Sequence, residues 1–189
     1  METQEIIILV GQAIGIVSFL ISCIRYFLKK KASIIKLSIF VYIFYIIHYF
    51  MIGAFAGSYA LVISLVRDTY LYQREIHHKK HRHRKFYNNA FVFIMLFVVY
   101  FSFMLLNIQN PMNILPLLAG VVYMSFEWFT TNKTTLKIAS AGTNIPWIVY
   151  DVLTLSFAGI IADSVSFVVA FLGILKDKKL RKKVVKHNH

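Results

Sequence analysis

The stretch LSIFVYIFYIIHYFMIGAFAGSYALVISLV (residues 37–66) runs for 30 residues without a charged side chain. A helix that crosses a bilayer needs about 20 mostly apolar residues, so this stretch is too long for one crossing. The segment GAFAGS at 53–58 interrupts it, and its two glycines and serine favour a tight turn. We therefore predict two membrane-spanning helices, at 37–55 and 59–73, joined by this turn.

The rest of the 189-residue chain has the same apolar character. Hydrophobic residues make up 58%, charged residues only 15%, and the mean hydropathy is +0.65. Soluble domains carry about a quarter charged residues, so this composition excludes a disordered chain, a coiled coil and an ordinary soluble enzyme. The single cysteine, Cys23, excludes a disulfide scaffold and a thiolate metal cluster.

Further uncharged stretches predict five more spans. The segment 107–113 divides the long uncharged stretch 86–126 into two, and the N-terminal flank has no basic residue, which favours a retained first span over a signal peptide. The predicted fold class is therefore all-α, a polytopic membrane protein with seven transmembrane helices in a single domain, residues 1–189. The five additional spans are 6–24, 86–106, about 113–126, 136–156 and 159–175.

The formal net charge of +13 can be interpreted from the positions of the basic residues relative to these spans. With Arg25 and Lys137 assigned to the basic ends of their spans, 20 of the 21 Lys and Arg residues fall on one side of the membrane, and the remaining one is Arg67, near the middle of a span. Cytoplasmic loops carry the excess of Lys and Arg, so we place the N-terminus outside and the C-terminus in the cytoplasm. The expected partners are the bilayer and its anionic lipids at the cytoplasmic face, and not nucleic acid.

The sequence matches itself at an offset of 102 residues without gaps. Phe55-Ala56-Gly57 then lies on Phe157-Ala158-Gly159, and Ser64 lies on Ser166. We predict two parallel three-helix units related by a two-fold axis along the membrane normal. The first unit is 6–75, the linker helix 86–106 restores the orientation, the second unit is 113–177, and a basic cytoplasmic tail follows at 178–189.

Two family resemblances accompany this 3+1+3 plan. The segment NIPWIVY (144–150) in the sixth span resembles the SWEET/PQ-loop (MtN3-like) superfamily, which implies solute transport between the two units. Most of the chain is more similar to the bacterial inner-membrane family typified by YgjV. That similarity rests on GQAIG at 11–15, HYFMIG at 48–53 and SLVRD at 64–68. It implies the architecture and an inner-membrane location, and it supplies no substrate.

Arg67 is the main candidate for function because a charge within a span is costly and usually faces the interior of the bundle. One interpretation is a substrate or gating site, and the other is a structural ion pair between helices. Asp68 is expected to be a poor partner, since adjacent residues point about 100° apart on a helix. Glu127 is expected to pair with Arg25 across the two-fold axis.

We predict a central substrate-binding cavity near the middle of the bilayer, lined by polar groups of both units. Asp151 and Asp163 are open to a second interpretation, as carboxylates at the outer interface, and His48 to that of a buried hydrogen-bonded histidine. The predicted site residues are Tyr45, His48, Ser64, Arg67, Asn144, Trp147, Asp151, Asp163 and Ser166.

The loop HHKKHRHRK (77–85) contains four histidines among basic residues that repel cations, which favours lipid contact or orientation over metal binding. Without a metal triad, nucleophile elbow or phosphate loop, we expect no enzyme, no metal and no cofactor. The predicted function is transport or facilitated passage of a small solute, generically a neutral polar one. The alternative is a receptor, structural or lipid-interacting protein on the same fold. Association with further copies of the chain is left open.

The predicted orientation can be tested by thiol labelling. A cysteine placed at Asn110, in a chain whose Cys23 is replaced by Ser, should react with a membrane-impermeant reagent added outside the cell. A cysteine at His81 should react only after the membrane is opened, because the basic loops are cytoplasmic. The reverse pattern would contradict the orientation.

Overall fold

The computed structural model describes residues 3–24, 28, 31–77, 86–107, 109–129 and 133–187. Within these ranges the chain forms seven α-helices and no strand, as long apolar segments do when their backbone groups must be paired internally. The helices are α1 (Thr3–Ile24), α2 (Lys31–Met51), α3 (Phe55–His77), α4 (Phe86–Leu106), α5 (Pro111–Phe129), α6 (Lys133–Leu153) and α7 (Phe157–His187).

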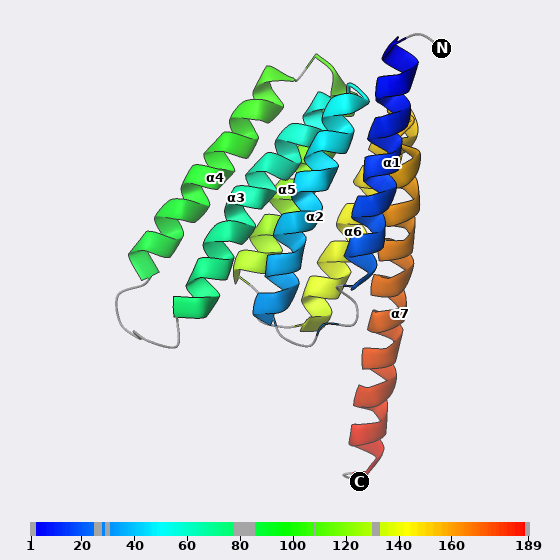
Figure 1. Ribbon diagram of the computed structural model, residues 1–189. Helices are drawn as coiled ribbons and strands as arrows, with labels where there is room; N and C mark the ends of the chain where they lie inside the picture. The colour runs from blue at the N-terminus through cyan, green and yellow to red at the C-terminus, as the bar shows by residue number, and fades with distance from the viewer. Residues whose placement is uncertain are drawn as a thin grey trace.

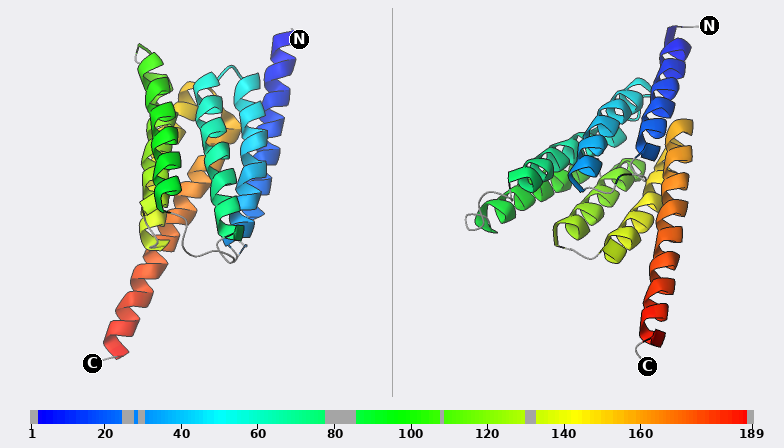
Figure 2. Two further views of the ribbon diagram at one scale, coloured as in Figure 1. Left: turned by 90° about the vertical axis from the view of Figure 1, so that its left-hand side faces the viewer. Right: turned by 60° about the horizontal axis from the view of Figure 1, so that its bottom comes forward.

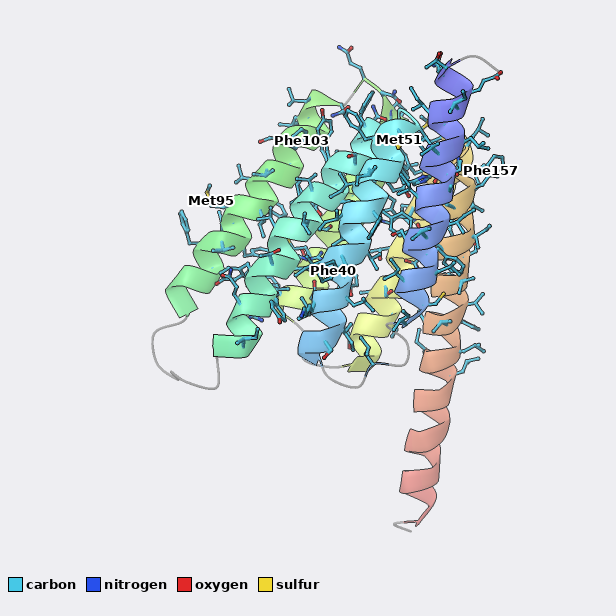
Figure 3. The ribbon with its side chains drawn as sticks, viewed as in Figure 1. Phe40, Met51, Met95, Phe103 and Phe157 are labelled. Atoms are coloured by element: carbon cyan, nitrogen blue, oxygen red, sulfur yellow. The ribbon has the colours of Figure 1, made fainter. Side chains whose placement is uncertain are left out.

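Four of these helices are long and apolar enough to cross a membrane on their own. They are 3–24, 33–51, 111–129 and 157–175. The apolar part of α4, residues 90–106, is shorter. Large apolar side chains cover the outside of the bundle, such as Met95 on α4 and Phe157 on α7 at its two edges (Figure 3). Such a continuous apolar exterior fits lipid and not water.

The predicted boundaries hold for α4 and need correction elsewhere. The turn at 53–58 is shorter than predicted, because Phe55-Ala56-Gly57 forms the first turn of α3, and Phe157-Ala158-Gly159 forms that of α7. The C-terminal segment was predicted as a tail after residue 177, but α7 continues as a helix to His187. Its last turns extend beyond the other helices (Figure 1).

Six helices form a closed ring. In order around the ring, α1 contacts α2, α2 contacts α3, α3 contacts α5, α5 contacts α6, α6 contacts α7, and α7 contacts α1. The remaining helix, α4, contacts only α3 and α5 among the described residues, and it lies at one edge of the bundle, opposite α1 and α7 (Figures 1 and 2). The ring therefore has an interior bounded by helices from both halves of the chain.

The turns that end α2 and α6 have the same hydrogen-bonded geometry. After α2, the amide of Gly53 donates to the carbonyl of Phe50 (3.2 Å), and the amide of Ala54 donates to the carbonyl of Tyr49 (2.8 Å). These two bonds, together with a residue of left-handed backbone conformation directly after the helix, form a Schellman motif. The turn after α6 repeats both bonds 102 positions later, with Leu155 in the place of Gly53.

The two turns differ in backbone strain. Gly53 has φ of 78°, which costs glycine nothing, whereas Leu155 has φ of 54°, which its Cβ disfavours by about 1–2 kcal/mol. The Leu155 side chain is 66% exposed and contributes little packing in return. The α6–α7 turn is thus held in this shape by the packing of the helices that it joins.

Substitution of Leu155 by Gly should therefore raise the free energy of unfolding in detergent by about 0.5–1 kcal/mol, after allowance for the greater freedom of glycine in the unfolded chain. Unfolding followed by circular dichroism measures it. Leu153→Gly, which changes another largely exposed leucine inside the last turn of α6, is the matched control and should destabilise. Equal losses in the two variants would contradict the strain assigned to Leu155.

Candidate functional site

The ring encloses a cavity of about 480 Å³, lined by residues of α2, α3, α5, α6 and α7. This volume lies within the range of about 300–1,000 Å³ that is usual for small-molecule sites. Seven of the nine predicted site residues line it. They are Tyr45, Ser64, Arg67, Asn144, Trp147, Asp163 and Ser166.

The wall combines aromatic and small polar side chains. The structure adds lining residues that the sequence did not indicate. The additional aromatic residues are Tyr42, Tyr49 and Tyr123, and the additional hydroxyl residues are Ser140 and Thr143. Apolar walls with a few placed polar groups are typical of sites that orient a small molecule.

Arg67 is buried at the cavity wall between two carboxylates. Its Nε lies 2.8 Å from Asp68 Oδ1 and 3.2 Å from Glu127 Oε2, and its side chain is 2% exposed. Its Nη2 donates to the Tyr42 hydroxyl at 3.4 Å, and its Cζ lies 5.3 Å from the centre of the Tyr123 ring. The cation therefore joins α3 to α5 and to α2.

Two predictions about this cluster need revision. The expectation that Asp68 is a poor partner is wrong: the long arginine stem lets the guanidinium fold back onto the neighbouring carboxylate although the two Cβ atoms diverge. Glu127 was expected to pair with Arg25, but its carboxylate lies against Arg67. Arg25 itself lies outside the described residues.

His48 does not line the cavity, contrary to its predicted role in substrate binding. It is fully buried between helices, with Nδ1 2.8 Å from the carbonyl oxygen of Gly11 and Nε2 2.8 Å from Ser156 Oγ. A carbonyl can only accept, so Nδ1 carries a proton, and in the neutral ring Nε2 accepts from the serine hydroxyl. Both ring nitrogens are therefore used in joining α2 to α1 and to the start of α7.

Asp151 also lies behind the wall. It is fully buried, so the interpretation as an outer interfacial carboxylate does not hold, and its Oδ1 accepts a hydrogen bond of 2.6 Å from the Tyr49 hydroxyl. The carboxylate lies against Gly159, where a Cβ would come within 2.5 Å of it. One helical turn further along α7, Asp163 lines the cavity.

Tyr100 of α4 is a structural residue that the sequence interpretation missed. Its ring is fully buried against Gly120 of α5, and its hydroxyl donates to the carbonyl of Ala60 at 3.1 Å. That donation makes Ser64 the donor in the 3.0 Å bond between the two hydroxyls. The feature of the sequence that could have identified Tyr100 is a tyrosine within a predicted helix whose other residues are mostly apolar.

The histidine-rich loop does not contribute to this site description. Residues 78–85 lie outside the described ranges, so the choice between lipid contact and metal binding at His78, His81 and His83 stays a prediction. Within the described ranges, no group of three or more His, Cys, Asp or Glu side chains is arranged to hold a metal ion.

Long apolar helices, an apolar exterior and a buried ionic cluster define a multi-pass integral membrane protein. The family model of a bacterial inner membrane protein, Imp-YgjV, matches residues 9–181, so the chain belongs to this family. No curated protein and no solved structure matches the chain significantly.

The ion cluster makes a prediction about stability. Arg67→Ala would leave the carboxylates of Asp68 and Glu127 buried without their shared cation, and breaking a buried pair from one side costs about 3–5 kcal/mol. We expect a marked loss of thermal stability in detergent.

A variant without any of the three charges (Arg67→Met, Asp68→Asn and Glu127→Gln) should recover most of this loss, because no buried charge is left uncompensated. Val66→Ala, on the exposed side of α3, controls for a general effect of substitution in this turn. An Arg67→Ala protein as stable as the parent would show that the cluster is not structural.

Proposed function

We propose that the protein transports or facilitates the passage of a small solute across the bacterial inner membrane, with the solute held in the central cavity. The observation that carries this proposal is the cavity itself. It lies inside the ring, its walls come from both halves of the chain, and it combines aromatic surface with buried polar groups. A site between two halves of a membrane bundle can be exposed to either side by a relative movement of those halves.

The proposal includes two parallel three-helix units, 6–75 and 113–177, joined by α4, with all seven helices spanning the membrane and the N-terminus outside. The helix contacts support it, because exchanging α1, α2 and α3 for α5, α6 and α7 reproduces every contact of the ring. The cavity supports it as well, because six pairs of its lining residues are 102 positions apart. These pairs are Val41 and Thr143, Tyr42 and Asn144, Tyr45 and Trp147, Leu61 and Asp163, Ser64 and Ser166, and Arg67 and Val169.

We interpret the structure as a state in which the central cavity is closed at one end. Near the two Schellman turns, the Tyr49 hydroxyl donates to Asp151, and the amide of Gly57 donates to the Tyr150 hydroxyl at 2.9 Å. Gln12 of α1 bonds there to the backbone of the other half at Leu155 (2.8 Å). With the N-terminus outside, these bonds close the outer end, and in the proposed cycle they break when that end opens.

The cavity wall continues toward the opposite end. Ile34 near the start of α2 and Ala170 of α7 both belong to it. The helical extension of α7 lies at that end, and we propose that this extension and the basic segments of the sequence contact anionic lipid headgroups of the cytoplasmic leaflet. The solute path would then lead from the central cavity toward the cytoplasm in this state.

Transport is tested with the full chain reconstituted into liposomes and offered a defined mixture of sugars, amino acids, amines and nucleosides, with mass spectrometry of the retained solutes. At least one solute should enter faster than in protein-free liposomes. A Ser166→Trp variant, which fills the cavity, should abolish the difference. Binding without movement would instead assign the protein to a receptor on the same fold.

The outer closure predicts a change in thiol accessibility. In a Cys23→Ser chain, Ser166→Cys should react slowly with an impermeant reagent added outside. Adding Tyr49→Phe removes the bond to a buried carboxylate, worth about 1.5–3 kcal/mol, so outside labelling should rise by roughly tenfold or more. Tyr59→Phe, an exposed tyrosine of α3, is the control. Equal labelling in both variants would contradict a closure held by Tyr49 and Asp151.

A further inference from the structure

We infer that the closed outer end binds one proton, held between His48 and Asp151 with Ser156 as the bridge, and that the proton is taken up when this end closes. The inference rests on the proposed function, since the closure is a step of the proposed cycle. In that cycle the proton would be the coupling ion. Three features support it: the hydrogen bonds of His48, an oxygen of Asp151 without a partner, and the position of both residues at bonds between the two halves.

The hydrogen bonds of His48 can be arranged in two ways. Nδ1 carries a proton in both, because it lies 2.8 Å from the carbonyl oxygen of Gly11, which can only accept. In a neutral ring Nε2 accepts from Ser156, and the hydroxyl hydrogen of Ser156 is then committed to His48. In a charged ring Nε2 donates to Ser156, whose hydroxyl hydrogen becomes available to another acceptor.

Asp151 is such an acceptor. Its Oδ1 accepts from the Tyr49 hydroxyl at 2.6 Å, but its Oδ2 has no hydrogen-bond partner among the described residues, although the side chain is fully buried. The carboxyl group and Ser156 Oγ lie at the same residue, Gly159. The amide of Gly159 donates to Ser156 Oγ at 3.2 Å, and a Cβ at this position would come within 2.5 Å of the carboxyl group.

The backbone amides at the start of α7 do not supply the hydrogen bond that Oδ2 needs. All four amides of the first turn already donate to other acceptors. They are the amides of Phe157 (to Leu155), Ala158 (to Gln12), Gly159 (to Ser156 Oγ) and Ile160 (to the Ser156 carbonyl). The helix N-terminus therefore acts on a carboxylate here only through its field, and Oδ2 gains no donor from it.

A single added proton satisfies the network. With neutral His48 and ionised Asp151, the one hydroxyl hydrogen of Ser156 cannot serve both Nε2 and Oδ2, and a buried acceptor without a donor is destabilising. A proton on Oδ2 lets Asp151 donate to Ser156 while Ser156 donates to His48. A proton on Nε2 reverses both bonds. The two arrangements differ by the transfer of two protons along the bridge, so the added proton belongs to the pair and not to one residue.

The basic residues of the surrounding helices lie far from Asp151. On α6, Lys137 precedes Asp151 by about four helical turns, or about 21 Å. On α2, Lys36 precedes Tyr49 by about 20 Å. Arg67 of α3 is engaged by its own two carboxylates. A proton is therefore the positive charge that can reach this site.

The other titratable side chains around the network supply no positive charge either. Among the described residues they are Tyr45 and Tyr49 of α2, Tyr150 of α6 and Asp163 of α7, whereas α1 contributes the uncharged Gly11 and Gln12. Phenol groups are neutral near pH 7, and an aspartate is either neutral or negative. None of these groups replaces the added proton.

Both members of the pair belong to bonds that join the two halves. His48 of α2 bonds to Ser156 just before α7, and Tyr49 of α2 bonds to Asp151 of α6. Opening this end would expose both groups to outside water, which hydrates a carboxylate without a proton. The closed state therefore binds one proton more than the open state. By linkage, the ratio of closed to open protein rises by at most tenfold for each unit by which the external pH falls.

Asp151→Asn tests the site, because the amide has the shape of a protonated carboxyl group and does not titrate. In the full chain in detergent, the melting temperature of the parent should fall relative to that of Asp151→Asn between about pH 6 and about pH 9. The reason is that the folded parent then loses a proton that the unfolded chain has already released. Glu5→Gln, the same change at an exposed carboxyl group of α1, is the matched control and should follow the parent.

Thiol labelling tests the link to closure. Ser166→Cys and Asn110→Cys, each in a Cys23→Ser chain, are labelled from outside with an impermeant reagent at each pH. The ratio of their rates corrects for the pH dependence of the reagent. We expect this ratio to rise about tenfold between pH 6 and pH 8 and to stay low at every pH when Asp151→Asn is added.

Ser156→Ala removes the bridge and keeps both titratable groups, which provides a test that does not need the Asp151 variant to fold. The rise in the labelling ratio should move to lower pH, since the proton loses its hydrogen-bonding partner. A merely structural role of Ser156 would lower the melting temperature without moving this profile. A labelling ratio of the parent that is independent of pH, an Asp151→Asn protein with the pH dependence of the parent, or an unmoved profile in Ser156→Ala would each overturn the inference.

The outcome separates this inference from the proposed function. If liposomes take up a solute at the same rate at every external pH and the labelling ratio does not change, the function stands and the proton inference fails. If the labelling ratio depends on pH and on Asp151 as expected but no solute crosses the membrane, the proton-dependent closure stands and transport fails.

Discussion

The ion cluster of Arg67, Asp68 and Glu127 is the interaction on which the ring depends. An arginine inside an apolar bundle is tolerated only when its charge is paired there. Here one carboxylate comes from α3 itself (Asp68) and the other from α5 (Glu127). The contact between α3 and α5 joins the two halves, so the cluster connects the folding of each half to the closure of the ring. The ring is also closed by the contact of α1 with α7, where small residues meet: Gly15 of α1 lies against Ala158 of α7.

The two helix contacts that close the ring, α3 with α5 and α7 with α1, correspond in position but differ in chemistry. At α3 and α5 a charge, a hydroxyl network and the inserted ring of Tyr100 act together. At α1 and α7 the helices approach through small side chains and through the amide of Gln12, which bonds to Leu155 and accepts from Ala158. Close approach of small residues is the usual way in which helices associate in lipid.

Much of this structure could be predicted from the sequence, because charge-free stretches and turn residues determine where helices run in a bilayer. α4 was predicted to the residue, and seven of the nine residues predicted to form a site line the cavity. Side-chain partners were harder to predict. Helix geometry gives the direction of a Cβ and not the end of a long side chain, so Asp68 was rejected as a partner of Arg67. His48 and Asp151 were assigned to the cavity because the helical periodicity of the sequence does not distinguish a residue that lines a cavity from one that is buried between helices behind the lining.

Tyr100 gives α4 a mechanical role beyond that of a tether. Because its ring is inserted between α3 and α5 and bonds to α3, the edge of the bundle at α4 is clamped. The opposite edge, at α1 and α7, has no inserted aromatic ring among the described residues and is joined instead by the Gln12 amide and by the contact of Gly15 with Ala158. In the proposed cycle, a movement that separated α3 from α5 would have to break the bond of Tyr100 to the carbonyl of Ala60 and withdraw its ring from Gly120.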